Sequence, residues 1–314
     1  MSAADTPVAI QPGGLWLAFT QNRLAWVGLV LLALIVLVAL LAPWLAPHDP
    51  LEQNIIARLE PPSAEFWLGT DSYGRDVLSR LIYGARISLF VGFVAILIAM
   101  LVGTAIGVLA GYIGGVFDQL VMGVLDVLLA FPTLLLGLMI AAMLGASLEN
   151  LIIAIAVTEV APFARVARAP TITLRQRDFV EASRSYGCGP FRIMTRHILP
   201  NMISDVVVMS SLWLASAIRT EASLSFIGLG VPPPAPTWGA MIREGFENIL
   251  DAWWLAVFPS LAILITVLAL NLLGDALRDA LDVRAQVDAA RPRWRDAVAM
   301  AKRRAGMVDS DPSP

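Results

Sequence analysis

The amino-acid sequence predicts an all-α integral membrane protein with six transmembrane helices. Of its 314 residues, 58% are hydrophobic and only 15% are charged, and the mean hydropathy is +0.74. Soluble domains are usually about one quarter charged, so this chain has too few charged residues to cover a water-facing surface. The apolar residues fall in long runs, and the basic residues are concentrated between alternate runs. Together these three observations indicate a multi-pass membrane protein.

Six apolar segments are candidates for membrane spans, which need about 20 mainly apolar residues. We expect them at 24–47, 87–117, 119–148, 151–164, 206–229 and 252–274. The first is longer than the apolar core of a signal peptide, which has about 7–15 residues, so we expect a retained helix. The fourth is the weakest candidate, because Glu159 and Pro162 interrupt it.

The basic residues outside these spans predict the orientation. Sixteen of them fall on one side of a six-span arrangement and five on the other. Because basic residues are enriched in cytoplasmic loops, we expect the first side, with both termini, to be cytoplasmic. The chain then divides into a cytoplasmic N-terminal segment (1–23), a first transmembrane helix (24–47), an extracytoplasmic segment (48–86), a five-helix core (87–282) with a cytoplasmic loop at 165–201, and a cytoplasmic tail (283–314).

Several classes of function are disfavoured by what the sequence lacks. The single cysteine, Cys188, excludes an intramolecular disulfide, and two histidines are too few for a multi-histidine metal centre. A phosphate-binding loop needs Gly-Lys followed by Ser or Thr, but the single lysine, Lys302, lies between Ala301 and Arg303. No convergent set of side chains favours a membrane-embedded enzyme. We therefore expect no catalytic site, metal, cofactor or nucleic-acid partner in this chain, and energy must come from a partner or an ion gradient.

Charged residues inside the expected spans are candidates for a translocation pathway or gate. Asp126, Arg219 and Glu221 are such residues, and charges at this depth tend to face protein or water. Arg219 and Glu221 are two positions apart, so they do not face each other on a helix. The alternatives for these charges are an interhelix hydrogen bond or snorkelling to the membrane surface. With Glu159, they are also the groups that an ion-gradient-driven secondary transporter or channel would use.

A glycine repeat marks the second expected span. Gly103, Gly107 and Gly111 recur every four residues. Such a stripe allows the backbone of another helix to approach closely. We favour packing within the subunit over a subunit interface.

The expected cytoplasmic loop contains a short charged helix followed by a turn. Apolar residues at helical spacing predict an amphipathic helix at 176–186. Gly187, expected at the C′ position, ends it, and a second short helix at 191–199 is expected to end at Pro200. Arg177 and Arg184 are spaced to pair with Glu181 on the first helix. Such a projection suits docking of another protein, and the alternative is an inert connecting loop.

This loop resembles a known signature. Glu181-Ala182-Ser183, Gly187 and Pro200 resemble the EAA motif of permease subunits in binding-protein-dependent ABC importers. The stretches 68–71, 74–76, 84–86, 221–230 and 271–279 resemble the shorter, C-type permease of the dipeptide, oligopeptide and nickel branch. Two departures are Ser183, where the motif has alanine, and Gly123, where relatives commonly carry an arginine beside Asp126.

The resemblance implies a fold, a function and partners. The fold is that of type I ABC importer permeases, and the function is to form half of the pathway for di- or oligopeptides or a similar small solute. Two cytoplasmic ATPase subunits, which use ATP and Mg, are expected to contact Glu181, Ala182, Ser183, Gly187 and Pro200. A second homologous permease and an extracytoplasmic substrate-binding protein complete the complex, in the inner membrane of a bacterial cell.

Overall fold

The computed structural model describes residues 23–290 and, in this part of the chain, consists of helices without a β-strand. Five helices are long and apolar enough to cross a membrane, and a bent pair can form a sixth span. The long helices are α2 (Arg23–Leu40), α4 (Val77–Ile113), α7 (Leu148–Leu174), α10 (Leu199–Ile227) and α12 (Trp254–Ala290). The bent pair is α5 (Gly115–Leu129) and α6 (Thr133–Leu144). The all-α membrane fold is thus confirmed, whereas the expected N-terminal segment before Arg23 and most of the tail lie outside the described residues.

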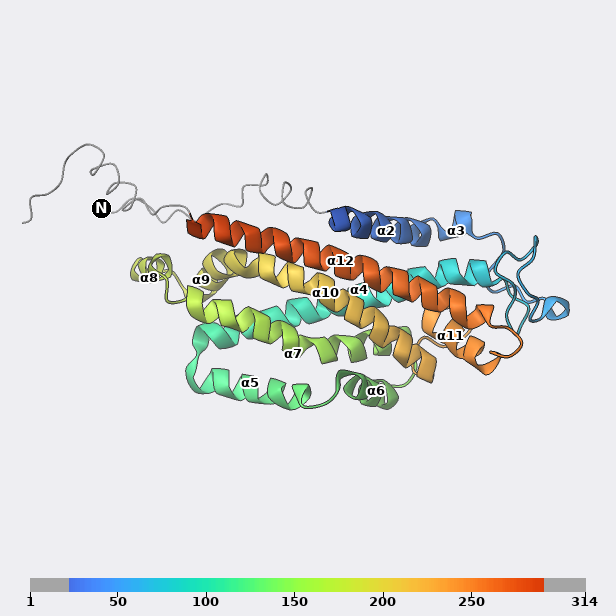
Figure 1. Cartoon of the computed structure of the whole chain (residues 1–314). Helices are drawn as coiled ribbons and strands as arrows, with labels where there is room; N and C mark the ends of the chain where they lie inside the picture. Colours follow the sequence, from blue (N-terminus) through green and yellow to red (C-terminus); the bar gives the residue numbers. More distant parts are fainter. Residues whose placement is uncertain (1–22, 291–314) are drawn as a thin grey trace, which may run out of the picture.

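The long helices run side by side, and the connections gather at two opposite ends (Figure 1). At one end lie the short helices α8 (Asp178–Ser185) and α9 (Pro190–Ile193). At the other end lie α11 (Trp238–Glu247) and the extended segment that contains the short helix η1 (Ile55–Ala57). We call these the α8 end and the α11 end of the bundle.

The glycine repeat packs α4 against α7, as expected for packing within the subunit. A β-carbon built on Gly103 would lie 2.5 Å from the carbonyl oxygen of Val160, and one on Gly107 would lie 2.2 Å from that of Ala164. These distances are far below van der Waals contact, so no larger residue fits without moving α7. Among the helices of the described part of the chain, α4 and α7 make the most extensive contact.

The third expected span is not a single helix. α5 and α6 are bent by 90° at a short break, and Pro132 is the N-cap of α6. A proline cannot donate the hydrogen bond that would continue α5 and clashes with the preceding turn, which explains the break.

The fourth span is longer than expected. α7 continues through Pro162 and Pro170 to Leu174, so Arg165 and Arg168 belong to the helix and not to the loop. α7 is the most buried of the membrane-length helices. Packing along its whole length, above all on α4, offsets the hydrogen bonds that the two prolines remove.

The expected end of the second short helix at Pro200 is wrong. α9 continues into a π-helical turn (Met194–Ile198) and then directly into α10, where Pro200 lies in the first turn. Proline is well accepted in the first turn because its missing N–H has no helical partner there. The chain is therefore helical without a loop from Pro190 to Ile227.

Candidate coupling and pathway sites

α8 is held mainly by Val180, with Phe179 half-buried beside it, and exposes most of its remaining surface. Val180 is fully buried in a cluster with Ile193 and Ile198. Glu181 and Ala182 are exposed, whereas the hydroxyl of Ser183 turns inward and donates to the carbonyl oxygen of Phe179 at 2.8 Å. The helix therefore presents the first two residues of the EAA-like triplet to a possible partner and uses the third internally.

Gly187 ends α8 in the expected left-handed conformation. Its φ is +78°. The N–H of Gly187 donates to the carbonyl oxygen of Arg184, and the N–H of Cys188 donates to that of Ser183, at 3.0 and 3.1 Å. This pattern is a complete Schellman motif. Because φ is positive here, any side chain would strain the turn, although the space around Gly187 is open.

Two arginines fix this end of the chain to α4. The guanidinium group of Arg175 donates to the carbonyl oxygens of Gly111 and Tyr112, at 3.1 and 3.0 Å, where α4 ends. The guanidinium group of Arg184 lies 5.9 Å above the ring of Tyr112. A cation at a helix C-terminus satisfies free carbonyl groups and the helix dipole. The sequence predicted Arg175 only as a topology signal and Arg184 also as a partner of Glu181, although arginine close to a helix end is a signal for such a cap.

The expected local ion pairs of Glu181 do not form. In the described part of the chain, Glu181 makes no ion pair with Arg177 or Arg184. Arg184 turns to Tyr112 instead, and Glu181 is left with an exposed carboxylate.

Asp126 has a partner that the sequence did not suggest. Arg165 donates to its carboxylate at 2.5 Å, and the two side chains are 53% and 56% exposed in this subunit. Nearer the α8 end, Arg168 binds Asp118 with two hydrogen bonds. The two pairs connect α5 to α7. Arg165 was missed because the helix was expected to end before it.

Arg219 and Glu221 lie on different sides of α10. Arg219 is exposed, whereas Glu221 is fully buried and accepts a hydrogen bond of 2.8 Å from the hydroxyl of Ser225. The carboxyl group of Glu221 therefore faces the interior of the subunit and not its surface. The structure does not bring Asp126 together with either residue.

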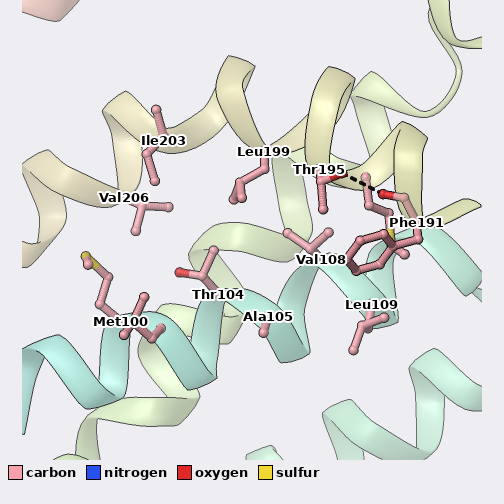
Figure 2. A pocket seen from close by; sticks show the side chains of 12 residues that line it. Met100, Thr104, Ala105, Val108, Leu109, Phe191, Thr195, Leu199, Ile203 and Val206 are labelled. Atoms are coloured by element: carbon pink, nitrogen blue, oxygen red, sulfur yellow. Dashed lines mark hydrogen bonds between the residues drawn. The ribbon is translucent and has the colours of Figure 1, made fainter.

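An apolar groove of about 280 Å³ lies beside the α8 end, between α4 and the run from α9 to α10 (Figure 2). Figure 2 shows Met100, Thr104 and Val108 of α4 facing Leu199 and Val206 across it. The hydroxyl of Thr104 has no hydrogen-bond partner. α4 thus packs tightly on α7 but leaves a gap toward α10.

Comparison with known proteins identifies the family. The model of the binding-protein-dependent transport system inner membrane component matches residues 103–287, and that of the N-terminal transmembrane domain of oligopeptide transport permease C matches residues 14–62. The chain is 45% identical over 288 residues to a di/tripeptide transport system permease protein DppC of Pseudomonas aeruginosa, covering 89% of this chain and 95% of that protein.

Other matches agree. A glutathione transport system permease protein GsiD of Escherichia coli is 45% identical over 268 residues, covering 85% of this chain and 88% of that protein. A solved structure of the MetNI methionine ABC transporter in an inward-facing conformation has a TM-score of 0.52 and 18% identity, covering 64% of this chain and 96% of the matched chain. That likeness supports the fold alone, which is the type I importer fold. The chain therefore belongs to the family of binding-protein-dependent transport system inner membrane components, as a C-type permease subunit of the peptide branch of ABC importers.

Proposed function

We propose that this permease forms half of the translocation pathway for short peptides and is driven by cytoplasmic ATPase subunits that bind α8. The observation that carries the proposal is the construction of α8. It is an exposed helix that ends in a rigid turn at Gly187, and it is anchored to the bundle through Val180 and Arg175.

A force on α8 can be transmitted to the membrane helices through two connections. Val180 lies in one buried cluster with Ile193 and Ile198, which belong to the continuous helical run that becomes α10. Arg175 connects the base of α8 to the end of α4. The groove between α4 and α10 leaves room for one helix to tilt against the other. Such a tilt would alternate access to the pathway.

We assign the α8 end to the cytoplasm. Arg175, Arg177, Arg184, Arg192 and Arg196 lie at this end, and basic residues favour the cytoplasmic side. The α11 end then faces the extracytoplasmic binding protein. Two ATPase subunits, which consume ATP and Mg, and a second permease complete the complex in the bacterial inner membrane.

The pathway is expected to lie against α5 and α7. A half-exposed ion pair between Asp126 and Arg165 is costly against lipid, so this face is suited to water or to the second permease. Arg219 remains a candidate for the pathway, because its side chain is exposed on α10. Glu221, being buried, is assigned to packing in this conformation.

The proposal is tested by co-purification of the ATPase subunits with a tagged permease, together with peptide uptake. Glu181→Lys should abolish both, because it reverses the charge on the exposed face of α8. Glu149→Lys, an exposed reversal at the opposite end, is the matched control and should retain ATPase binding. If Glu181→Lys and Gly187→Arg both bind the ATPase and transport like the parent, α8 is not the coupling element, and an ion-gradient-driven transporter becomes the better explanation.

A further inference from the structure

The α11 end contains a cavity of about 650 Å³ with both charged and apolar lining residues. It lies between the extracytoplasmic segment, the start of α4, the loop after α10, and α11. Its charged and polar lining includes Tyr73, Arg75, Arg80, Arg243, Glu244 and Glu247. Sites for small molecules typically measure about 300–1,000 Å³, so the cavity is large enough for a small solute.

The wall of the cavity is built from charges of both signs. Arg75 and Arg80 are only 5% and 4% exposed. The Nε atom of Arg75 lies 2.6 Å from the carboxylate of Asp71, and its Nη2 atom lies 3.4 Å from that of Glu244. The Nε atom of Arg80 lies 3.1 Å from Asp71, and its Nη2 atom lies 3.9 Å from Glu244. Two guanidinium groups thus face two carboxylates, and the charges balance.

The hydrogen bonds in this cluster are incomplete. The Nε atom of Arg80 contacts Asp71 as an ion pair without hydrogen-bond geometry, and its Nη1 atom has no hydrogen-bond partner. The Oε1 atom of Glu244 already accepts from the N–H and the hydroxyl of Ser72. The cluster therefore leaves the Nη1 donors of Arg80 without an acceptor. Buried donors of a charged group are costly when unpaired, and each such group in a native protein calls for an explanation.

The missing acceptor and the balanced charges together indicate a ligand with two charged ends. A carboxylate could complete the guanidinium group of Arg80, since arginine binds carboxylates through paired N–H donors. On the same wall, Glu247 is 61% exposed and paired with Arg243 at 3.2 Å, so its carboxylate can reach an ammonium group. A polyanion would instead need a net positive cavity.

We propose that this cavity is a subsite for short peptides with free ends, in which Arg75 and Arg80 receive the carboxylate and Glu247 the ammonium group. The inference rests on the proposed function, because it places the subsite at the extracytoplasmic mouth of the peptide pathway. It adds a contact between this permease and both ends of its substrate, independent of the binding protein.

The test measures peptide protection of a cysteine in the cavity wall. Ala240→Cys, in a Cys188→Ser background, is placed in the transporter complex purified through a tag on this chain, without the binding protein. The rate of thiol labelling on this chain is followed by mass spectrometry with trialanine, N-acetyl-trialanine or trialanine amide. Leu250→Cys, which is 96% exposed at the same end but does not line the cavity, is the control.

Trialanine should slow labelling at position 240 and not at position 250. Each capped peptide should protect about ten-fold more weakly, as expected for one lost charge-assisted hydrogen bond. Glu247→Gln should remove the difference in protection between trialanine and N-acetyl-trialanine. Arg80→Lys should remove the difference between trialanine and trialanine amide. Glu247 is exposed, so its variant should fold even where the Arg80 variant does not.

Equal protection by all three peptides, or no protection, would overturn the subsite. If the Ala240→Cys complex then still takes up peptide with its binding protein, the subsite alone fails. If the unmodified complex takes up no peptide, the proposed function itself fails.

Discussion

The two faces of α4 differ in how closely they pack. Toward α7, three glycines bring the two backbones close together, and a β-carbon at Gly107 would lie 2.2 Å from the backbone of α7. Toward α9 and α10, the same stretch of α4 borders an open apolar groove of about 280 Å³. Close packing resists relative movement, whereas a gap permits it. We infer that α4 and α7 move as one body and that α10 moves against them.

The largest expected loss of stability comes from disrupting the close contact between α4 and α7. Gly107→Leu should destabilise the protein by about 3 kcal/mol, because the new side chain meets the backbone of α7 and not a flexible side chain. Thermal denaturation of the purified complex, followed by size-exclusion chromatography, measures the change. The matched control is Gly123→Leu on α5, where nothing lies within 4 Å of an added β-carbon and little change is expected. Equal loss in both variants would contradict the rigid α4–α7 unit.

The second expected effect concerns the joint between α4 and α8. Arg175→Gln should cost about 2 kcal/mol, because two charge-assisted hydrogen bonds to the end of α4 are lost. If α4 receives force from α8 through this arginine, ATP hydrolysis should continue while peptide uptake falls. The ratio of uptake to hydrolysis in proteoliposomes measures this. Arg177→Gln, an exposed neighbour, should leave the ratio unchanged.

A smaller effect is expected where α5 meets α7. A double-mutant cycle with Asp126→Asn and Arg165→Gln should give an interaction energy of about 1 kcal/mol, since both side chains are half exposed. Peptide uptake should fall in both single variants if the pair faces the pathway. Normal uptake in both, with the same interaction energy, would assign the pair to packing.

The smallest effect on stability is expected at the open face. Ala105 lines the groove and is exposed in this subunit. Ala105→Leu should therefore change the free energy of unfolding by no more than about 0.5 kcal/mol. It should nevertheless slow peptide uptake if the groove closes during transport. Ala110→Leu, at a fully buried position on the same helix, should instead be destabilising. A large loss of stability in Ala105→Leu would show that the groove is not free to accept a side chain.

The local structure of the proposed coupling site was largely predictable from the sequence, and the partners of the candidate pathway residues were not. Gly187 lies in a left-handed turn, as the local pattern of charged helix, glycine and proline indicated. The partners of Asp126 and Arg175 could not be predicted, since they come from positions 39 and about 64 residues away in the chain. The orientation of Glu181 was also wrong in detail, because Arg184 has an aromatic partner on another helix.

The sequence by itself determined the all-α membrane fold, the packing stripe of α4 and the turn after α8, because these depend on composition and on neighbours within one or two helical turns. Only the tertiary structure decided how far α7 extends, that Pro200 lies within a continuous helical run and does not end a helix, and which charges meet. It also placed Arg75 and Arg80 against Glu244 of α11. Helix ends and ion pairs in a membrane bundle depend on burial against segments distant in the chain, and a local sequence pattern does not predict those contacts.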